Sequence, residues 1–239
     1  MGVRSLSHRT RNTKRGSWIL RTIRWLFVIA ISFCLLTIAG VFSLRWINPP
    51  TTAMIMRDPL VADHWLGNRW TDLDDISAQL PLAVISSEDQ KFPDHMGFDF
   101  EAIADALEEQ RKRPRGASTI TQQLAKNLFL WPGRSYVRKG LEAWFTLWME
   151  WLWPKQRIME VYLNVIEYGP GVYGVTTASE RFFHKSPARL TRTEASLLAA
   201  VLPNPKRMSA SQPSAYVWSR SYEIRQAMRA LGGISYLPW

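Results

Sequence analysis

The 239-residue sequence predicts a mainly α-helical protein, with one membrane-spanning helix followed by a single helical domain. Three observations support this fold class. Residues 25–44 form an apolar run without a charge. From about residue 76, apolar residues recur at helical spacing almost to the end of the sequence. No run of alternating apolar and polar residues indicates strands. With 46% hydrophobic and 21% charged residues, the chain is also able to form a packed core.

The apolar run WLFVIAISFCLLTIAGVFSL, residues 25–44, lies between Arg24 and Arg45. At about 1.5 Å per residue it spans about 30 Å as a helix, the thickness of a bilayer's hydrocarbon core. A cleaved signal peptide has a shorter apolar stretch of roughly 7–15 residues, and a buried core helix usually has a polar face. We therefore expect an uncleaved anchor. The single cysteine, Cys34, lies within it, so no intrachain disulfide can form.

The net charge of +10 is concentrated before the anchor. Residues 1–24 contain seven Lys and Arg and no acidic residue, which leaves +3 (10 − 7) for the remaining sequence. This tail is expected in the cytoplasm, so that residues 46–239 face the opposite side of the membrane. No nucleic-acid recognition motif accompanies the positive charge, and we expect no nucleic-acid partner.

Four segments are therefore predicted: a basic cytoplasmic tail (1–24), a transmembrane helix (25–44), a linker and docking segment (45–75) and a helical domain (76–239). The linker contains Pro49, Pro50 and Pro59 and shows little periodicity. Periodicity and capping residues predict the helices of the domain. They cover residues 78–88 and 100–112, a helix that Ser118 or Thr119 caps and that runs through Leu130, residues 136–153, a helix that starts at Pro154, and residues 175–183, 193–201 and 214–231. A basic loop, residues 111–116, interrupts them.

The first candidate for chemistry is SSEDQKFPDHMGFD, residues 86–99. Glu88 and Asp89 follow an apolar run and precede a turn that contains His95 and Gly97. A carboxylate at such a polar–apolar boundary can have the raised pKa that a general base or acid requires. The alternative is a carboxylate at a helix end that faces solvent. An acidic pair alone favours this alternative, because such pairs are common.

The second candidate is GASTITQQLAKN, residues 116–127. On a helix, Thr119, Gln122 or Gln123, and Lys126 share one face. Hydroxyl, amide and ammonium groups in such a stripe can hold phosphate or sugar oxygens. The alternative, an ordinary amphipathic helix with a hydrated face, is supported equally.

The third candidate is RKGLE, residues 138–142, where Arg138 and Glu142 share a helix face. Arg138 and Lys139 could neutralise a diphosphate, and Glu142 could orient them or bind a divalent cation. The alternative is a surface ion pair worth roughly a few tenths of a kcal/mol, which this motif alone favours. Four histidines and one cysteine show no zinc-ligand spacing.

Two further motifs follow: KQRIMEVYLNVIEYGPGVYGV, residues 155–175, and ASERFFHKSPARLTRTEASLLAAVLPNP, residues 178–205. The five motifs occur in one order, and together they resemble the glycosyltransferase family 51 domain of peptidoglycan polymerases. The similarity covers residues 60–235, approximately. It implies a lysozyme-like helical fold with a larger lobe and a smaller, membrane-dipping jaw lobe. It also implies lipid II as the substrate.

The resemblance implies a role for each matching position. Glu88 would be the general base that takes the proton from the acceptor's 4-hydroxyl, and Glu142 a second essential carboxylate. The donor is the growing strand, whose anomeric carbon is inverted as undecaprenyl diphosphate leaves. The positions expected to bind or shape the substrate site are Asp89, Phe92, His95, Ser118, Thr119, Gln123, Lys126, Arg138 and Lys139. Architectural roles are expected for Tyr162, Asn164 and Gly169.

The implied setting is the bacterial inner membrane, with one membrane span and a periplasmic catalytic domain. The implied partners are lipid II, the lipid-linked growing glycan strand, the bilayer and proteins of cell-wall synthesis or division. No cofactor is expected, and a divalent cation near Glu142 stays open. Because the sequence contains no Ser-x-x-Lys tetrad, we expect no transpeptidase activity.

Two rival functions stay open, a lytic muramidase that uses Glu88 as an acid and a non-catalytic scaffold. The tryptophan-rich helix also allows two interpretations. Trp144, Trp148 and Trp151 could lie at the bilayer surface, or they could pack in the core.

Overall fold

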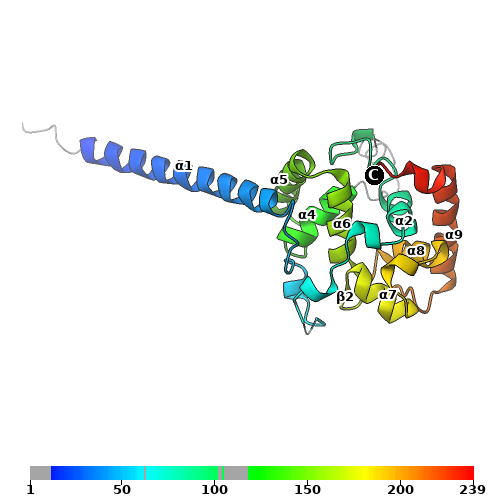
Figure 1. Cartoon of the computed structure of the whole chain (residues 1–239). Helices are drawn as coiled ribbons and strands as arrows, with labels where there is room; N and C mark the ends of the chain where they lie inside the picture. Colours follow the sequence, from blue (N-terminus) through cyan, green and yellow to red (C-terminus); the bar gives the residue numbers. More distant parts are fainter. Residues whose placement is uncertain (1–11, 62, 102–103, 105–117) are drawn as a thin grey trace, which may run out of the picture. The chain divides into compact units, whose positions relative to one another are not determined.

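The computed structural model describes residues 12–61, 63–101, 104 and 118–239, and it confirms the mainly helical fold class (Figure 1). The chain divides into two units, Met1–Gly40 and Val41–Trp239. The predicted helix at residues 100–112 and the basic loop at residues 111–116 lie largely outside the described residues.

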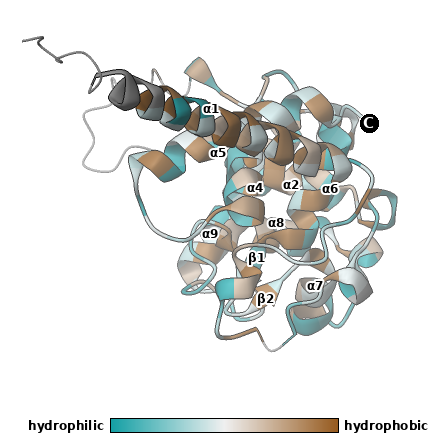
Figure 2. Cartoon of the chain, turned by 90° about the vertical axis from the view of Figure 1, so that its left-hand side faces the viewer, coloured by the Kyte–Doolittle hydropathy of each residue, from teal (hydrophilic) through white to brown (hydrophobic). Residues whose placement is uncertain are grey.

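The N-terminal helix α1 (Asn12–Ser43) contains almost the whole predicted apolar run. It begins earlier than the run, and Leu44 lies in the turn after it. The 26 residues Trp18–Ser43 are long and apolar enough to cross a membrane, and Figure 2 shows hydrophobic residues along much of α1. Few of these residues are buried. The Thr37 hydroxyl donates to the Phe33 carbonyl at 2.9 Å, which satisfies its polar group within the helix. A core helix would instead bury its apolar side chains.

The segment predicted as a linker contains three short 3-10 turns, η1 (Ile55–Arg57), η2 (Gly67–Arg69) and η3 (Leu73–Asp75). It packs along the domain rather than leaving it. The Ala53 amide donates to the Leu128 carbonyl at 3.0 Å. Further along, Asn164 accepts from the Thr71 amide at 3.0 Å and donates to the Thr71 carbonyl at 2.8 Å. These bonds hold irregular backbone against two helices of the domain.

The helices of the domain pack in two groups. One group contains α2 (Gln79–Glu88), α8 (Arg192–Val201) and α9 (Ala215–Ala230). The other contains α4 (Ile120–Phe129), α5 (Tyr136–Leu152) and α6 (Lys155–Val165). Every residue from Ala195 to Val201 of α8 is buried, and small alanines there let the neighbouring helices approach closely. Helix α7 (Val175–Phe183) contacts α6.

Capping chemistry sets where these helices begin. Thr119 and Thr191 each form a capping box with the side chain three residues on, at the starts of α4 and α8. Ser135 caps α5. Pro154 precedes the first residue of α6 and occupies its N-cap, one position before the first turn where we expected it.

A short antiparallel hairpin, β1 (Glu167–Gly169) with β2 (Val172–Tyr173), is present although the sequence shows no run of alternating apolar and polar residues. Strands of three and two residues are too short to show the alternating pattern by which a sequence indicates a strand. Gly171 turns the chain with a φ of +67°, a conformation that favours glycine.

The tryptophans at the end of α5 differ in exposure. Trp151 is 69% exposed, whereas Trp144 and Trp148 are half-buried and contact each other edge-on at 5.6 Å. Trp153 is buried, and its indole N–H donates to the Val41 carbonyl at 2.8 Å. Core packing therefore accounts for Trp153, and exposure to a bilayer surface stays a hypothesis for Trp151.

Candidate active site

Glu88, the candidate general base, is the last residue of α2. Residues Leu80–Ser86 of α2 are buried, so packing around them holds the end of this helix in place. The Glu88 carboxylate is half-buried, and both of its oxygens accept hydrogen bonds. Oε1 accepts from the Ser87 hydroxyl at 3.1 Å, and Oε2 accepts from Gln123 Nε2 at 3.0 Å. This arrangement differs from a helix-end carboxylate that simply faces solvent.

A cleft of about 650 Å³ opens beside Glu88. Ser118 and Gln123 line it from the start of α4, and Arg220 and Glu223 line it from α9. A second cavity of about 370 Å³ is lined by Lys126 together with residues near the β hairpin, and Gln123 lines this cavity as well. Gln123 therefore lines both cavities and lies next to the candidate base.

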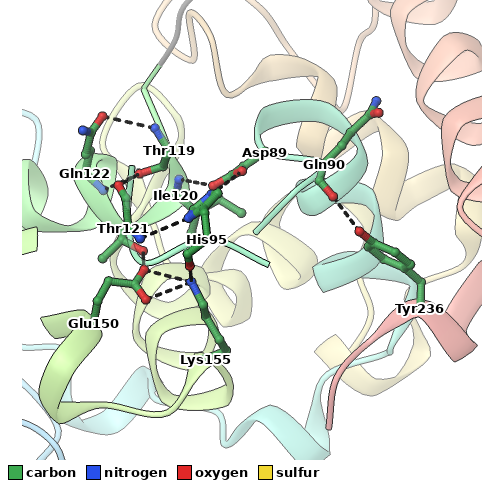
Figure 3. Close-up of polar contacts among 11 residues, drawn as sticks. Asp89, Gln90, His95, Thr119, Ile120, Thr121, Gln122, Glu150, Lys155 and Tyr236 are labelled. Atoms are coloured by element: carbon green, nitrogen blue, oxygen red, sulfur yellow. Dashed lines mark hydrogen bonds and ion pairs between the residues drawn. The ribbon is translucent and has the colours of Figure 1, made fainter. Parts of the chain in front are cut away.

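Asp89 joins the first motif to the start of α4 (Figure 3). One carboxylate oxygen lies 2.9 Å from His95 Nε2, and the other accepts from the Ile120 amide at 3.0 Å. The Gly97 amide donates to His95 Nδ1 at 3.1 Å, so Nδ1 is an acceptor and Nε2 carries the proton. His95 is thus a neutral donor to Asp89, and the two side chains brace the turn that follows Glu88.

Phe92 is fully buried and lies against Lys155, whose ammonium is 4.5 Å from the centre of the ring. Lys155 also donates to the His95 carbonyl at 2.6 Å and pairs with Glu150 at 2.8 Å (Figure 3). Thr121 donates to the same Glu150. Phe92, Asp89 and His95 therefore line neither of the two cavities and pack around the turn that follows Glu88.

Sequence reasoning did not single out Glu150 and Lys155. They lie on different helices on either side of Pro154, so no helical spacing relates them. Only the packing of α5, α6 and the first motif brings their charges together.

The second motif separates into a structural part and a part that faces the cleft. Thr119 is buried: its hydroxyl donates to the Gly97 carbonyl at 2.8 Å and accepts from the Gln122 amide at 3.2 Å. Ser118, Gln123 and Lys126 line one or both cavities. Of the expected polar stripe, Gln123 and Lys126 reach a cavity, whereas Thr119 is committed to the helix cap; the binding role of the stripe stays a prediction.

The third motif forms a buried cluster of charges at the start of α5. Arg138 and Glu142 are only 9% and 3% exposed, and Arg138 Nη1 donates to Glu142 Oε2 at 2.7 Å. Lys139 pairs with the other oxygen of Glu142 and lies 3.5 Å from the Ser118 hydroxyl. The alternative interpretation, an ion pair at the surface, is therefore wrong for Arg138 and Glu142, because both side chains are buried.

Positive charge exceeds negative charge around this cluster. Burial lowers the pKa of Lys126, an effect that Glu142 and Glu88 oppose and that Arg138 and Lys139 reinforce. Lys126 therefore feels both the candidate base and the third motif. The buried Nε of Arg138 has no hydrogen-bond partner among the residues that the structure describes. Three cationic side chains around one carboxylate can accommodate a doubly charged anion.

Gly97→Ala tests whether close packing around the turn of the first motif stabilises the fold. Its φ is +80°, and an added Cβ would lie 2.6 Å from Thr146 Cγ2 and 2.8 Å from Glu150 Cγ. Gly97→Ala should therefore destabilise the fold by about 2 kcal/mol, lowering the melting temperature by roughly 4–8 °C. Thermal unfolding followed by circular dichroism in detergent measures this. Gly133→Ala is the control, because Gly133 has a φ of +111° with no atom within 4 Å. Equal losses in both variants would show that the contacts of Gly97 contribute nothing.

Comparison with known proteins adds independent support. A family model described as Transglycosylase matches residues 59–229. A relative from Shewanella oneidensis is 49% identical, with 91% of this chain and 95% of the relative covered. A relative from Xanthomonas campestris is 47% identical, with 91% and 92% covered. One from Pseudomonas fluorescens is 47% identical, with 92% and 91% covered. Each is named biosynthetic peptidoglycan transglycosylase. The ordered motifs, the helical fold and these similarities agree, and the chain belongs to the transglycosylase family.

Proposed function

We propose that this protein is a peptidoglycan glycosyltransferase that polymerises lipid II into glycan strands. One observation carries the proposal. A held carboxylate, Glu88, lies at a cleft near a cluster of cations in which Arg138 Nε is buried without a partner in the described part of the chain. A base next to an anion-binding cluster is what a sugar transfer with a diphosphate leaving group requires. The names of the relatives support the same substrate class.

In the proposed reaction, Glu88 takes the proton from the acceptor's 4-hydroxyl. The acceptor oxygen forms a bond to the donor's anomeric carbon as the bond from that carbon to the diphosphate breaks. The configuration inverts from α to β, and undecaprenyl diphosphate leaves with the bonding electron pair. The two cavities that Gln123 lines offer room for a donor sugar and an acceptor sugar. Base catalysis contributes on the order of 10²–10⁴ in rate.

The cationic cluster would stabilise the leaving diphosphate. Lys126, Arg138 and Lys139 supply the positive charge, and Ser118 supplies a hydroxyl between the cleft and Lys139. Glu142 would hold Arg138 and Lys139 in place before the substrate arrives. Donors fixed in advance need no reorganisation when charge develops on the leaving oxygen.

A divalent cation at Glu142 does not fit the residues present. Both carboxylate oxygens already face cationic side chains. Among the described residues, no three His, Cys, Asp or Glu side chains gather in a group that could hold a metal. Magnesium can bind through a single carboxylate together with substrate phosphates, but at Glu142 it would have to displace Arg138 or Lys139 from a carboxylate oxygen. We therefore propose that polymerisation proceeds without a metal at this position.

We also propose the membrane arrangement. Helix α1 would span the inner membrane once, with the basic residues 1–24 in the cytoplasm and the catalytic domain in the periplasm. This placement keeps the long lipid of the substrate in the bilayer next to the enzyme. Proteins of cell-wall synthesis or division are the expected partners.

The test incubates the full chain in detergent with labelled lipid II. We expect glycan polymer and released undecaprenyl diphosphate, at the same rate with and without a metal chelator. Preformed glycan is supplied in a parallel reaction. Loss of that glycan without polymer formation would instead identify a lytic muramidase, and absence of both reactions would favour a scaffold. A rate that collapses in chelator would contradict the proposal of a metal-free reaction.

A further inference from the structure

Tyr162, for which a mostly architectural role is expected, contacts the candidate active site. It lies in α6 and is fully buried. Its hydroxyl donates to Gln123 Oε1 at 2.9 Å, and Gln123 Nε2 donates to Glu88 Oε2 at 3.0 Å. Three helices thus contribute one residue each to a chain of hydrogen bonds that ends on the candidate base.

The phenol of Tyr162 determines which group donates in each of these hydrogen bonds. Burial raises the pKa of Tyr162 well above its usual value, and the negative charge of Glu88 adds to the effect. The hydroxyl therefore stays protonated and is available as a donor. A glutamine amide has one acceptor oxygen and a donor NH₂ group. With its oxygen taking the phenolic proton, the NH₂ group of Gln123 faces Glu88.

The opposite orientation of the amide is unfavourable while Glu88 is ionised. It would place the Gln123 carbonyl oxygen against the carboxylate, and both groups are acceptors. A donor facing the carboxylate instead stabilises the charged form. Only this charged form can accept a proton from a sugar hydroxyl.

We propose that Tyr162 is a positioning residue: it fixes the orientation of the Gln123 amide so that Glu88 is held in its proton-accepting form. The inference rests on the proposed role of Glu88 as general base. It assigns a catalytic consequence to a side chain of the fourth motif that does not line either cavity.

Other charged groups near Glu88 come from several elements and do not change when Tyr162 is altered. Asp89 is its neighbour in the chain, and Lys126 on α4 interacts with it electrostatically. From α9, Tyr216, Arg220 and Glu223 line the same cleft. A change in pH dependence after substitution of Tyr162 therefore reports on the amide.

The test compares Tyr162→Phe with Tyr168→Phe in the full chain, with lipid II polymerisation measured between about pH 5 and pH 9. Tyr168 is also fully buried, but its hydroxyl faces the Leu163 carbonyl at 3.4 Å. Tyr162→Phe should lower kcat about tenfold with KM changed less than about twofold. The acidic limb of its pH–rate profile should move to higher pH by about half to one unit, because loss of the oriented donor favours protonation. Tyr168→Phe should keep the wild-type profile.

A double-mutant cycle tests whether Tyr162 acts through Gln123. In the Gln123→Met background, Tyr162→Phe should cause no further loss of kcat, and an additive loss would overturn the inference. A folded Tyr162→Phe with the wild-type kcat and pH profile would overturn it as well. If Tyr162→Phe does not fold, Gln123→Met carries the test, since it removes both bonds and should shift the acidic limb in the same direction. An unshifted limb would then overturn the proposal.

Glu88→Gln in the same assay distinguishes failure of the proposed role of Glu88 from failure of the proposed role of Tyr162. If Glu88→Gln polymerises lipid II at the wild-type rate, the proposed function of Glu88 is wrong. If Glu88→Gln is inactive while Tyr162→Phe behaves as wild type, only the role of Tyr162 is wrong.

Discussion

Glu88→Gln should reduce the rate of lipid II polymerisation by about 10²–10⁴-fold, the range expected when a general base is lost. Glutamine keeps the size of the side chain, and its amide oxygen can still accept from Gln123 Nε2. The fold should therefore be unchanged, with a melting temperature within about 2 °C of wild type. Polymer formation from labelled lipid II measures the rate, and circular dichroism measures the melting temperature.

The control for this prediction is Glu223→Gln. Glu223 lines the same cleft from α9, so the substitution removes one negative charge from the same space. We expect it to retain activity within about tenfold, since a nearby charge acts more weakly than the reacting base. Similar losses in both variants would attribute the effect to the charge of the cleft. Full activity of Glu88→Gln would rule out base catalysis by this residue.

Glu142→Gln should impair both stability and activity. It leaves Arg138, only 9% exposed, without the carboxylate that compensates its charge. Removing one partner of a buried pair costs about 3–5 kcal/mol, equivalent to a fall of roughly 6–20 °C in melting temperature. Polymerisation should fall by at least about tenfold even below that temperature, because Arg138 and Lys139 lose their common anchor.

Glu101→Gln provides the matched comparison. Glu101 pairs with Lys91 at the surface, with side chains 79% and 50% exposed, and loss of such a pair costs less than about 1 kcal/mol. Equal melting temperatures for the Glu142 and Glu101 variants would show that the buried cluster does not stabilise the fold. Normal polymerisation by a folded Glu142→Gln would show that Glu142 does not organise the cations.

Local chemistry explains which parts of the fold were predictable. The starts of α4, α5 and α6 depend on Thr119, Ser135 and Pro154, whose effects act within a few residues. The apolar run of α1 is similarly local. Its earlier start at Asn12 was missed because helix formation continues into polar residues that a hydropathy criterion ignores. The β hairpin was missed because its strands are too short for periodicity.

The motif residues of the candidate site could be predicted from the sequence, but their burial and the contacts between them could not. Spacing places Arg138 and Glu142 on one face, but it does not reveal that the pair is buried. The bond from Asp89 to the Ile120 amide spans 31 residues and exists only once the first motif packs on α4. The bond from Tyr162 to Gln123 spans 39 residues and likewise depends on the packing of α6 against α4. Long-range contacts of this kind have no signature in one sequence.

The hydrogen bond between Thr119 and the Gly97 carbonyl has a consequence for variation among related chains. It fixes two points that are 22 residues apart in sequence, with the hydroxyl oxygen of Thr119 2.8 Å from the carbonyl oxygen of Gly97. The entropic cost of holding two such points together grows slowly with the length of chain between them, by about 0.6 kcal/mol for each doubling. Insertions or deletions between the first and second motifs should therefore be tolerated without displacing Glu88 from Gln123. That stretch can diverge in length and sequence while the distance between base and amide is conserved.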